Sequence, residues 1–93
     1  MARKAVWKGM MYEAGDIAVA TPFRLGKVLG VIQHTQNSKI TLVVQGLSSS
    51  ELQDGFAVAR DSGVVEGWRL DDVEVKQATC WHSNADGTLT VIP

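Results

Sequence analysis

Cysteine and histidine stand two residues apart near the C-terminal end of the sequence, at Cys80 and His82 on either side of Trp81. Zinc favours thiolate and imidazole ligands, and residues two apart on a strand point to the same side. A zinc site needs three or four ligands, however, and only His34 remains as a third. A Cys–His nucleophile pair is disfavoured too, because such residues lie about 6.6 Å apart along a strand. We therefore predict a buried, unreactive cysteine beside a surface histidine, and no metal site.

The acidic residues in the C-terminal third of the chain do not form a catalytic pattern either. Asp71 and Asp72 are adjacent, so on a strand they would face opposite sides and could not act as paired carboxylates; a turn leading into a strand is the better interpretation. Asn84, Asp86 and Gly87 resemble part of a calcium loop, but the later acidic ligand is missing, and a β-turn is favoured. The glycines form neither a dinucleotide-binding nor a phosphate-binding loop. We expect no catalytic residue and no cofactor.

Large apolar side chains crowd one short N-terminal segment beside two lysines. Residues of these types are enriched in the cores of protein interfaces, where rigid rings bury a large area at low cost in entropy. The alternative is an ordinary strand that covers one end of the fold. The segment contains Trp7, Met10, Met11 and Tyr12, with Lys4 and Lys8 beside them.

Trp68 and Trp81 are open to the same two interpretations. In a chain of 93 residues three tryptophans cannot all be fully internal, so at least one is expected to line a groove or a partner contact. The residues predicted to bind a partner are Trp7, Met11, Tyr12, Trp68 and Trp81.

Composition bounds the class of protein. Ten acidic and nine basic residues give a formal net charge of −1, without the strong basic excess of most nucleic-acid-binding proteins. Leu, Ile, Val and Phe make up 25 of the 93 residues, enough for a packed core. No apolar run approaches the roughly 20 residues of a membrane span, and no signal peptide is visible. We expect one domain over residues 1–93, cytoplasmic and away from membranes.

The hydrophobic pattern predicts strands at most positions, because Val, Ile and Thr are frequent and apolar residues often alternate with polar ones. The first predicted strand covers residues 17–21 and ends at Pro22; the second, 27–35, bends at a bulge around Gly30; the third, 40–45, pairs with the second as a hairpin. These strands and a later one contribute the predicted core: Ile17, Val19, Val28, Ile32, Leu42, Val44, Val73 and Val75.

The middle of the chain is ambiguous between helix and strand. Ser48 and Glu51 have the spacing of a capping box, which favours one helical turn before a strand at 56–60. Asp61-Ser62-Gly63 suits a hairpin loop that joins this strand to 64–68. A further strand is expected from Val73 toward Trp81. Residues 84–87 then form the turn of a terminal hairpin.

The order GDIAVATPF, GKVLGVI, ITLVV and WRLDDVEV resembles the small SH3-like barrels, including Tudor-type and KOW-type modules. The resemblance runs from Gly15 to Val75. It implies an all-β fold: a small SH3-like barrel of five or more antiparallel strands with an additional C-terminal hairpin. KOW modules often contact RNA or the transcription machinery, and Pro22-Phe23-Arg24 resembles part of their motif.

These patterns leave three hypotheses for function. The leading one is a non-catalytic binding module that contacts another protein of unknown identity or its own copies through sheet edges and the segment from Trp7 to Tyr12. The second is an RNA-binding or nucleic-acid accessory module that uses Arg24, Lys27 and Lys39. The third is a small-molecule enzyme whose pocket forms only at an oligomer interface; a shared cleft lined by His34 or aspartates would favour it.

Overall fold

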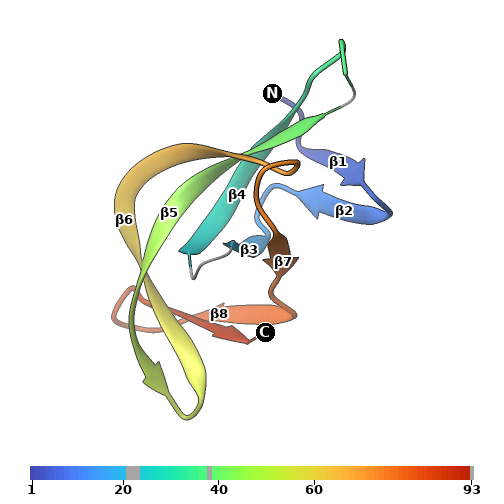
Figure 1. The fold of residues 1–93 in the computed structure, drawn as a ribbon. Coiled ribbons are helices and arrows are strands. Elements are labelled where there is room, and N and C mark those ends of the chain that lie inside the picture. The colour runs from blue at the N-terminus through green and yellow to red at the C-terminus, as the bar shows by residue number, and fades with distance from the viewer. Residues whose placement is uncertain (21–23, 38, 93) are drawn as a thin grey trace.

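The computed structural model describes residues 1–20, 24–37 and 39–92, and the described residues contain no helix. No segment of this part of the chain thus forms a helix long and apolar enough to cross a membrane. This part of the chain forms nine strands, which Figure 1 draws as arrows. Their bounds are β1 Lys4–Trp7, β2 Met10–Glu13, β3 Ile17–Ala20, β4 Arg24–Gln33, β5 Ile40–Gln53, β6 Phe56–Arg69, β7 Val75–Gln77, β8 Cys80–Ser83 and β9 Leu89–Ile92.

The strands form two antiparallel sheets. β1 and β2 make a two-stranded sheet, and the other seven form one sheet in the order β7-β3-β4-β5-β6-β9-β8. The all-β prediction is confirmed, and so is the terminal hairpin, here β8–β9 with Gly87 in the left-handed region of its turn. Between the described residues no ladder joins β7 to β8, so closure into an SH3-like barrel stays a prediction. Pro22 and Phe23, singled out in the sequence, lie outside the described residues.

A β-bulge in β4 decides which of its residues face the core. Val28 pairs with Val44 and Gly30 with Val43, which leaves Leu29 as the extra residue, 40% exposed. Each extra residue shifts the alternation of side chains by one. Val31 therefore points into the core at 0% exposure, and Ile32 is 42% exposed. The predicted bulge is confirmed, but the prediction that Ile32 belongs to the core is wrong.

β5 and β6 form one long, strongly bent ribbon, where the sequence predicted a helical turn and two shorter strands (Figure 1). The chain reverses at Asp54-Gly55, both at positive φ, as a tight two-residue hairpin requires. Asp61-Ser62-Gly63 does not reverse the chain. Gln45 pairs with Val65 and Leu47 with Asp61, so three residues of β6 bulge opposite one residue of β5. The helical turn and the loop at 61–63 were wrong because ladder pairing on both sides overrides these local signals.

The segment after β6 also differs in part from the sequence prediction. Asp71 and Asp72 do lie in a turn, closed where the amide of Asp72 donates to the carbonyl of Arg69 at 3.0 Å. The strand expected from Val73 toward Trp81 is instead two strands, β7 and β8, because the chain leaves one edge of the sheet and joins the other.

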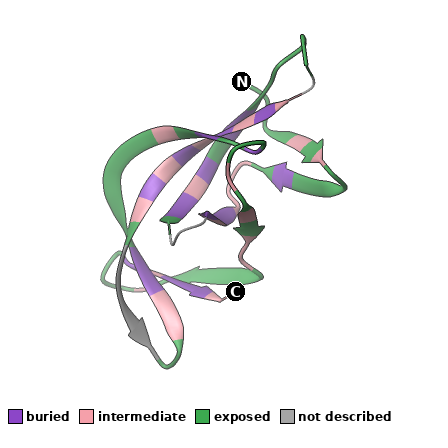
Figure 2. Cartoon of the chain, viewed as in Figure 1, coloured by how far each residue is buried: buried purple, intermediate pink, exposed green. Residues whose placement is uncertain are grey.

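The core divides into two neighbouring clusters of buried side chains (Figure 2). The larger packs Trp68 and Tyr12 against the centres of β4 and β5; the smaller joins β3, the start of β4, β6 and β9. Four of the predicted core residues are fully buried: Ile17, Val28, Leu42 and Val44. Val19, Val73 and Val75 are half-buried at the margins of the clusters.

Replacing Leu42 and Ile32 tests this assignment, because both are aliphatic and stand on paired strands. Leu42→Ala is expected to lower the free energy of unfolding by about 2 to 5 kcal/mol, since it empties a fully buried position. Ile32→Ala, on the outer face, should cost less than about 1 kcal/mol. Urea unfolding followed by tryptophan fluorescence measures both. Equal costs would mean that the register of β4 after the bulge is wrong.

Candidate functional site

The β1–β2 hairpin has an inner face that attaches it to the rest of the molecule. Cross-strand pairing places Ala5 opposite Tyr12 and Trp7 opposite Met10, so these four side chains share one face. Tyr12 is 5% exposed within the larger core cluster, and Ala5 and Trp7 pack against that cluster. Burial raises the pKa of the Tyr12 phenol. Of the predicted binding residues, Tyr12 therefore supports the fold and Trp7 is half-buried.

The outer face of the same hairpin has no such covering. Val6 and Met11 are cross-strand partners there, 58% and 51% exposed. Lys4 pairs with Glu13 two residues further along the strands, so opposite charges flank the apolar pair. Met11 was among the binding residues predicted from the sequence, whereas Val6 was not. The alternation of apolar residues across a tight turn could have revealed it, had residues 4–13 been recognised as a hairpin.

The turn between β1 and β2 places a cation beside an aromatic ring. Lys8 and Gly9 both have positive φ, at 49° and 80°, and such a turn is favourable for glycine but strained for lysine. The Lys8 ammonium lies 5.7 Å from the centre of the Trp7 ring. Next to it is a notch of about 210 Å³, with Trp7, Tyr12 and Leu70 in its wall and Met10 and Glu74 among its other lining residues.

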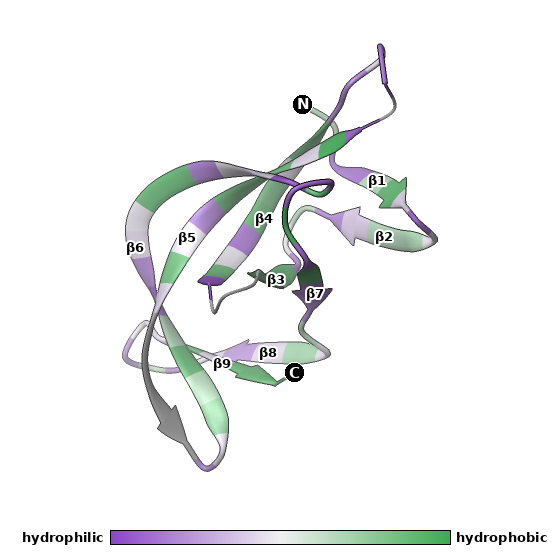
Figure 3. Cartoon of the chain, viewed as in Figure 1, coloured by the Kyte–Doolittle hydropathy of each residue, from purple (hydrophilic) through white to green (hydrophobic). Residues whose placement is uncertain are grey.

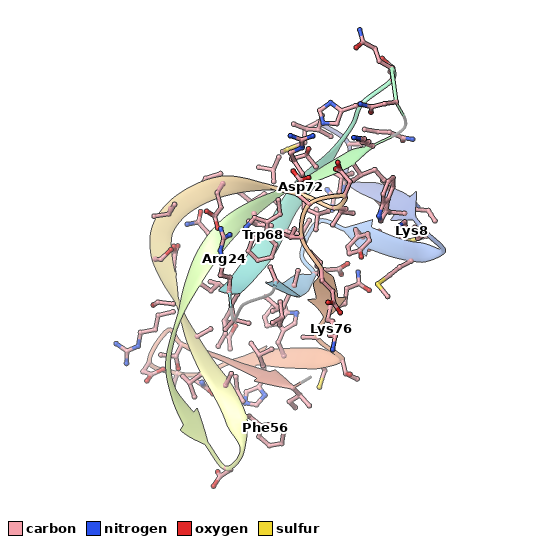
Figure 4. All side chains as sticks on the ribbon, in the orientation of Figure 1. Lys8, Arg24, Phe56, Trp68, Asp72 and Lys76 are labelled. Atoms are coloured by element: carbon pink, nitrogen blue, oxygen red, sulfur yellow. The ribbon has the colours of Figure 1, made fainter. Side chains whose placement is uncertain are left out.

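Trp68 lies inside the bend of β5 and β6, where Figure 4 shows it beside Arg24. It is 2% exposed, and a Cβ at position 26 would meet its ring at 2.9 Å, so only glycine lets β4 approach this closely. The Arg24 guanidinium lies 5.5 Å from the ring centre and pairs with Glu66. Trp68 is thus a core residue with a polar edge, not an exposed binding residue.

Glu66 receives two hydrogen bonds at this place. The Trp68 Nε1–H group donates to Glu66 Oε1 at 2.8 Å, and Arg24 donates to the same oxygen. These bonds hold the pKa of the Glu66 carboxyl below its ordinary value of 4.5, and the bond from Trp68 has the largest effect. A cleft of about 440 Å³ opens beside the pair, with Leu25, Leu47, Ser62 and Val64 in its lining. Its two charged groups already neutralise each other.

Trp81 lies in β8, away from the hairpin. It is 38% exposed, and the Lys27 ammonium sits 5.7 Å from its ring centre. Cys80 is exposed, so the prediction of a buried cysteine is wrong. The reason is that Cys80 lies on the last strand of the sheet, where no further strand of the described chain covers it.

The structure does not bring the five predicted binding residues together. Trp7, Met11 and Tyr12 belong to the hairpin, Trp68 to the core and Trp81 to β8. The basic residues of the nucleic-acid hypothesis are also dispersed. Arg24 and Lys39 lie at opposite ends of the β4–β5 pair, about 30 Å apart along the strand, and Lys39 contacts Asp71 at 3.1 Å.

His34, the residue that the third hypothesis placed in a shared cleft, is exposed on the β4–β5 connection, with Nε2 3.0 Å from the Thr41 hydroxyl. Within residues 1–20, 24–37 and 39–92, no three His, Cys, Asp or Glu side chains gather closely enough to bind a metal ion. A scan of protein-family models and searches of curated proteins and of solved structures found no match to this chain.

The hydrogen bonds to Glu66 predict how stability depends on pH. Because the folded-state pKa is lowered, the stabilisation is complete above the unfolded-state value of about 4.5 and is lost as the pH falls through the folded-state pKa. Glu66→Gln keeps an oxygen acceptor but removes the titration. The free energy of unfolding, measured in urea from about pH 7 down to about pH 3, should therefore fall less steeply in this variant.

Trp68→Phe provides the matched comparison, because it removes the indole donor and retains an aromatic ring in the core. It should reproduce part of the flattening at acid pH, in addition to a loss of stability that does not depend on pH. Identical pH slopes in the parent and the Glu66→Gln variant would show that the carboxylate makes no such bonds.

Proposed function

We propose that this protein is a non-catalytic binding module that associates with its own copies through the outer face of the β1–β2 hairpin. The observation that carries the proposal is the exposed cross-strand pair of Val6 and Met11. Figure 3 shows apolar colouring on both strands of this hairpin, which projects from the main sheet. Large apolar side chains held in water by a structured element favour contact with another surface.

The hairpin is fixed before any partner arrives. Tyr12 and Trp7 anchor its inner face in the larger core cluster, and the amide of Ala14 donates to the carbonyl of Arg3 at 2.7 Å across its base. A preformed contact surface loses little conformational entropy on binding. The outer face therefore presents its side chains in a set arrangement.

Charge at the base of the hairpin favours a second copy as the partner. Lys4 and Glu13 lie side by side on the outer face, next to Val6 and Met11. A two-fold axis parallel to the strands would place Lys4 of each copy opposite Glu13 of the other, and Val6 opposite Met11. Such a surface is complementary to itself, as a symmetric dimer contact requires.

Removing the apolar pair tests this function. Val6→Thr with Met11→Gln keeps β-branching and side-chain length while making both positions polar, and both residues are more than half exposed, so the fold should persist. The parent should scatter light as a dimer or larger at about 100 μM, where a dissociation constant near 1 μM gives mostly complex. The double variant should shift toward monomer by at least about tenfold in dissociation constant.

Val65→Thr is the matched control, because Val65 is 57% exposed on β6, outside the hairpin. It should associate as the parent does. A monomeric parent at about 100 μM would overturn the proposed function. An oligomer that survives the double variant unchanged would show that the hairpin face is not its contact.

A further inference from the structure

Strand β8 ends the seven-stranded sheet, and no strand of the described chain pairs with its outer side. Its four residues, Cys80 to Ser83, are all exposed, and Figure 2 shows the strand as a continuous exposed band. Natural edge strands commonly carry Lys, Pro or a bulge that blocks pairing with another chain. Within β8 there is no Pro, Lys, Arg, Asp or Glu.

At the opposite edge of the sheet, β7 makes a side-chain contact with the β1–β2 hairpin. β7 lies against the β1–β2 hairpin, where the Gln77 side chain donates to the Met11 carbonyl at 2.6 Å and to Asp16 Oδ2 at 3.1 Å. β7 also carries the exposed Lys76. The two edge strands of the sheet therefore differ: β7 contacts the hairpin, whereas no strand of the described chain pairs with the outer side of β8.

The ladder between β8 and β9 determines which backbone groups face outward. The amide of Asn84 donates to the carbonyl of Thr88 at 2.8 Å, and residues of an antiparallel ladder alternate between facing their partner and facing away. The N–H and C=O groups of His82 thus face β9, and those of Trp81 and Ser83 face away. No backbone hydrogen bond from the described residues reaches these outward groups.

We propose that β8 pairs antiparallel with β8 of a second copy, around a two-fold axis at His82. Pairing around this axis sets Trp81 opposite Ser83 of the second copy, and Ser83 opposite Trp81 of the second copy. Each of these two pairs exchanges two backbone hydrogen bonds, which gives four in total. An axis at Trp81 would need outward groups at Thr79, but the amide of Thr79 already donates to Ile92 at 2.8 Å. An axis at Ser83 would run into the turn that begins at Asn84.

The side chains suit this register. The large Trp81 would face the small Ser83 of the second copy, and Lys27 holds its ammonium over the Trp81 ring on the same side. His82 would face His82 of the second copy at a pair without hydrogen bonds, where Cα atoms are about 4.5 Å apart. A partner strand is recognised here by backbone geometry, as in other cases of strand addition.

This contact extends the proposed self-association by a second surface, because β8 and the β1–β2 hairpin lie at separate places on the molecule (Figure 1). Two different two-fold contacts on each copy link copies into a chain or a closed ring. The hairpin contact and the β8 contact can therefore fail independently.

Amide hydrogen exchange measured by NMR tests the contact residue by residue. Raising the parent from about 10 to about 500 μM should slow exchange at Trp81 and Ser83 by about fourfold for a dissociation constant near 50 μM. The His82 amide, bonded to β9 in the monomer, should be protected at both concentrations. No concentration dependence at Trp81 and Ser83 overturns the proposal.

Substitutions at Ser83 separate the backbone from the side chain. Ser83→Pro removes an outward N–H, which an edge strand tolerates, and should abolish the concentration dependence at Trp81. Ser83→Ala keeps that N–H and should behave as the parent. Equal effects of the two variants would overturn pairing through the backbone. The Val6→Thr, Met11→Gln variant should retain the effect, and loss of the effect there would mean that β8 has no contact of its own.

Disulfide trapping tests the register. His82→Cys in a Cys80→Ser background should form a covalent dimer under mild oxidation, because the predicted Cα distance lies within the disulfide range. The parent Cys80 would lie about 13 Å from Cys80 of the second copy along the strands and should cross-link at least tenfold more slowly. Equal cross-linking at both positions would overturn the axis at His82. A trapped dimer in a protein that lacks the hairpin contact would support β8 while refuting the hairpin.

Discussion

The hydrogen-bonded ladder between β5 and β6 is the interaction on which the other elements depend. It pairs residues 41–53 with residues 56–69, interrupted by two register shifts, and β4 and β9 attach to its outer sides. Both shifts bend the ribbon, since the extra residues lengthen β6 at the first shift and β5 at the second. The bend is what encloses Trp68, and without that enclosure the larger core cluster would lose its largest side chain.

Burial of Trp68 shows how a polar edge is accommodated in this bend. The ring reaches β4 because Gly26 has no side chain, and its indole N–H finds an acceptor in Glu66. That acceptor is shared with Arg24, so the charges along the cleft are compensated from within the molecule. The charges that line the cleft are thus paired with each other, and the two contact surfaces that we propose lie elsewhere, on the hairpin and at β8.

Both proposed surfaces arise because a small β-fold leaves one face of a hairpin and the edge strands of a sheet without a partner. A two-stranded hairpin buries one face and presents the other to water, which exposes Val6 and Met11 opposite the anchored Tyr12. A sheet of seven strands without a closing ladder between its described residues has two edges, and at the β7 edge the Gln77 side chain bonds to the hairpin. The hairpin that contacts β7 thus also carries the proposed contact face, and both depend on how it is anchored in the core.

The strand content, the bulge near Gly30, the terminal hairpin and half of the predicted core residues agree with the structure, because alternation and turn residues act over a few neighbours in the chain. The sequence predictions were wrong where hydrogen bonds between strands far apart in the chain decided the structure. One extra residue in β4 put Val31 in the core and Ile32 on the surface. Gly63 lies in a bulge of β6 and not in a hairpin loop. Cys80 is exposed because β8 is the last strand of the sheet. The sequence by itself determined which residues favour strands and turns. Only the tertiary structure decided which strand became an edge and which tryptophan was enclosed, because sheet order and register depend on hydrogen bonds between residues far apart in the chain.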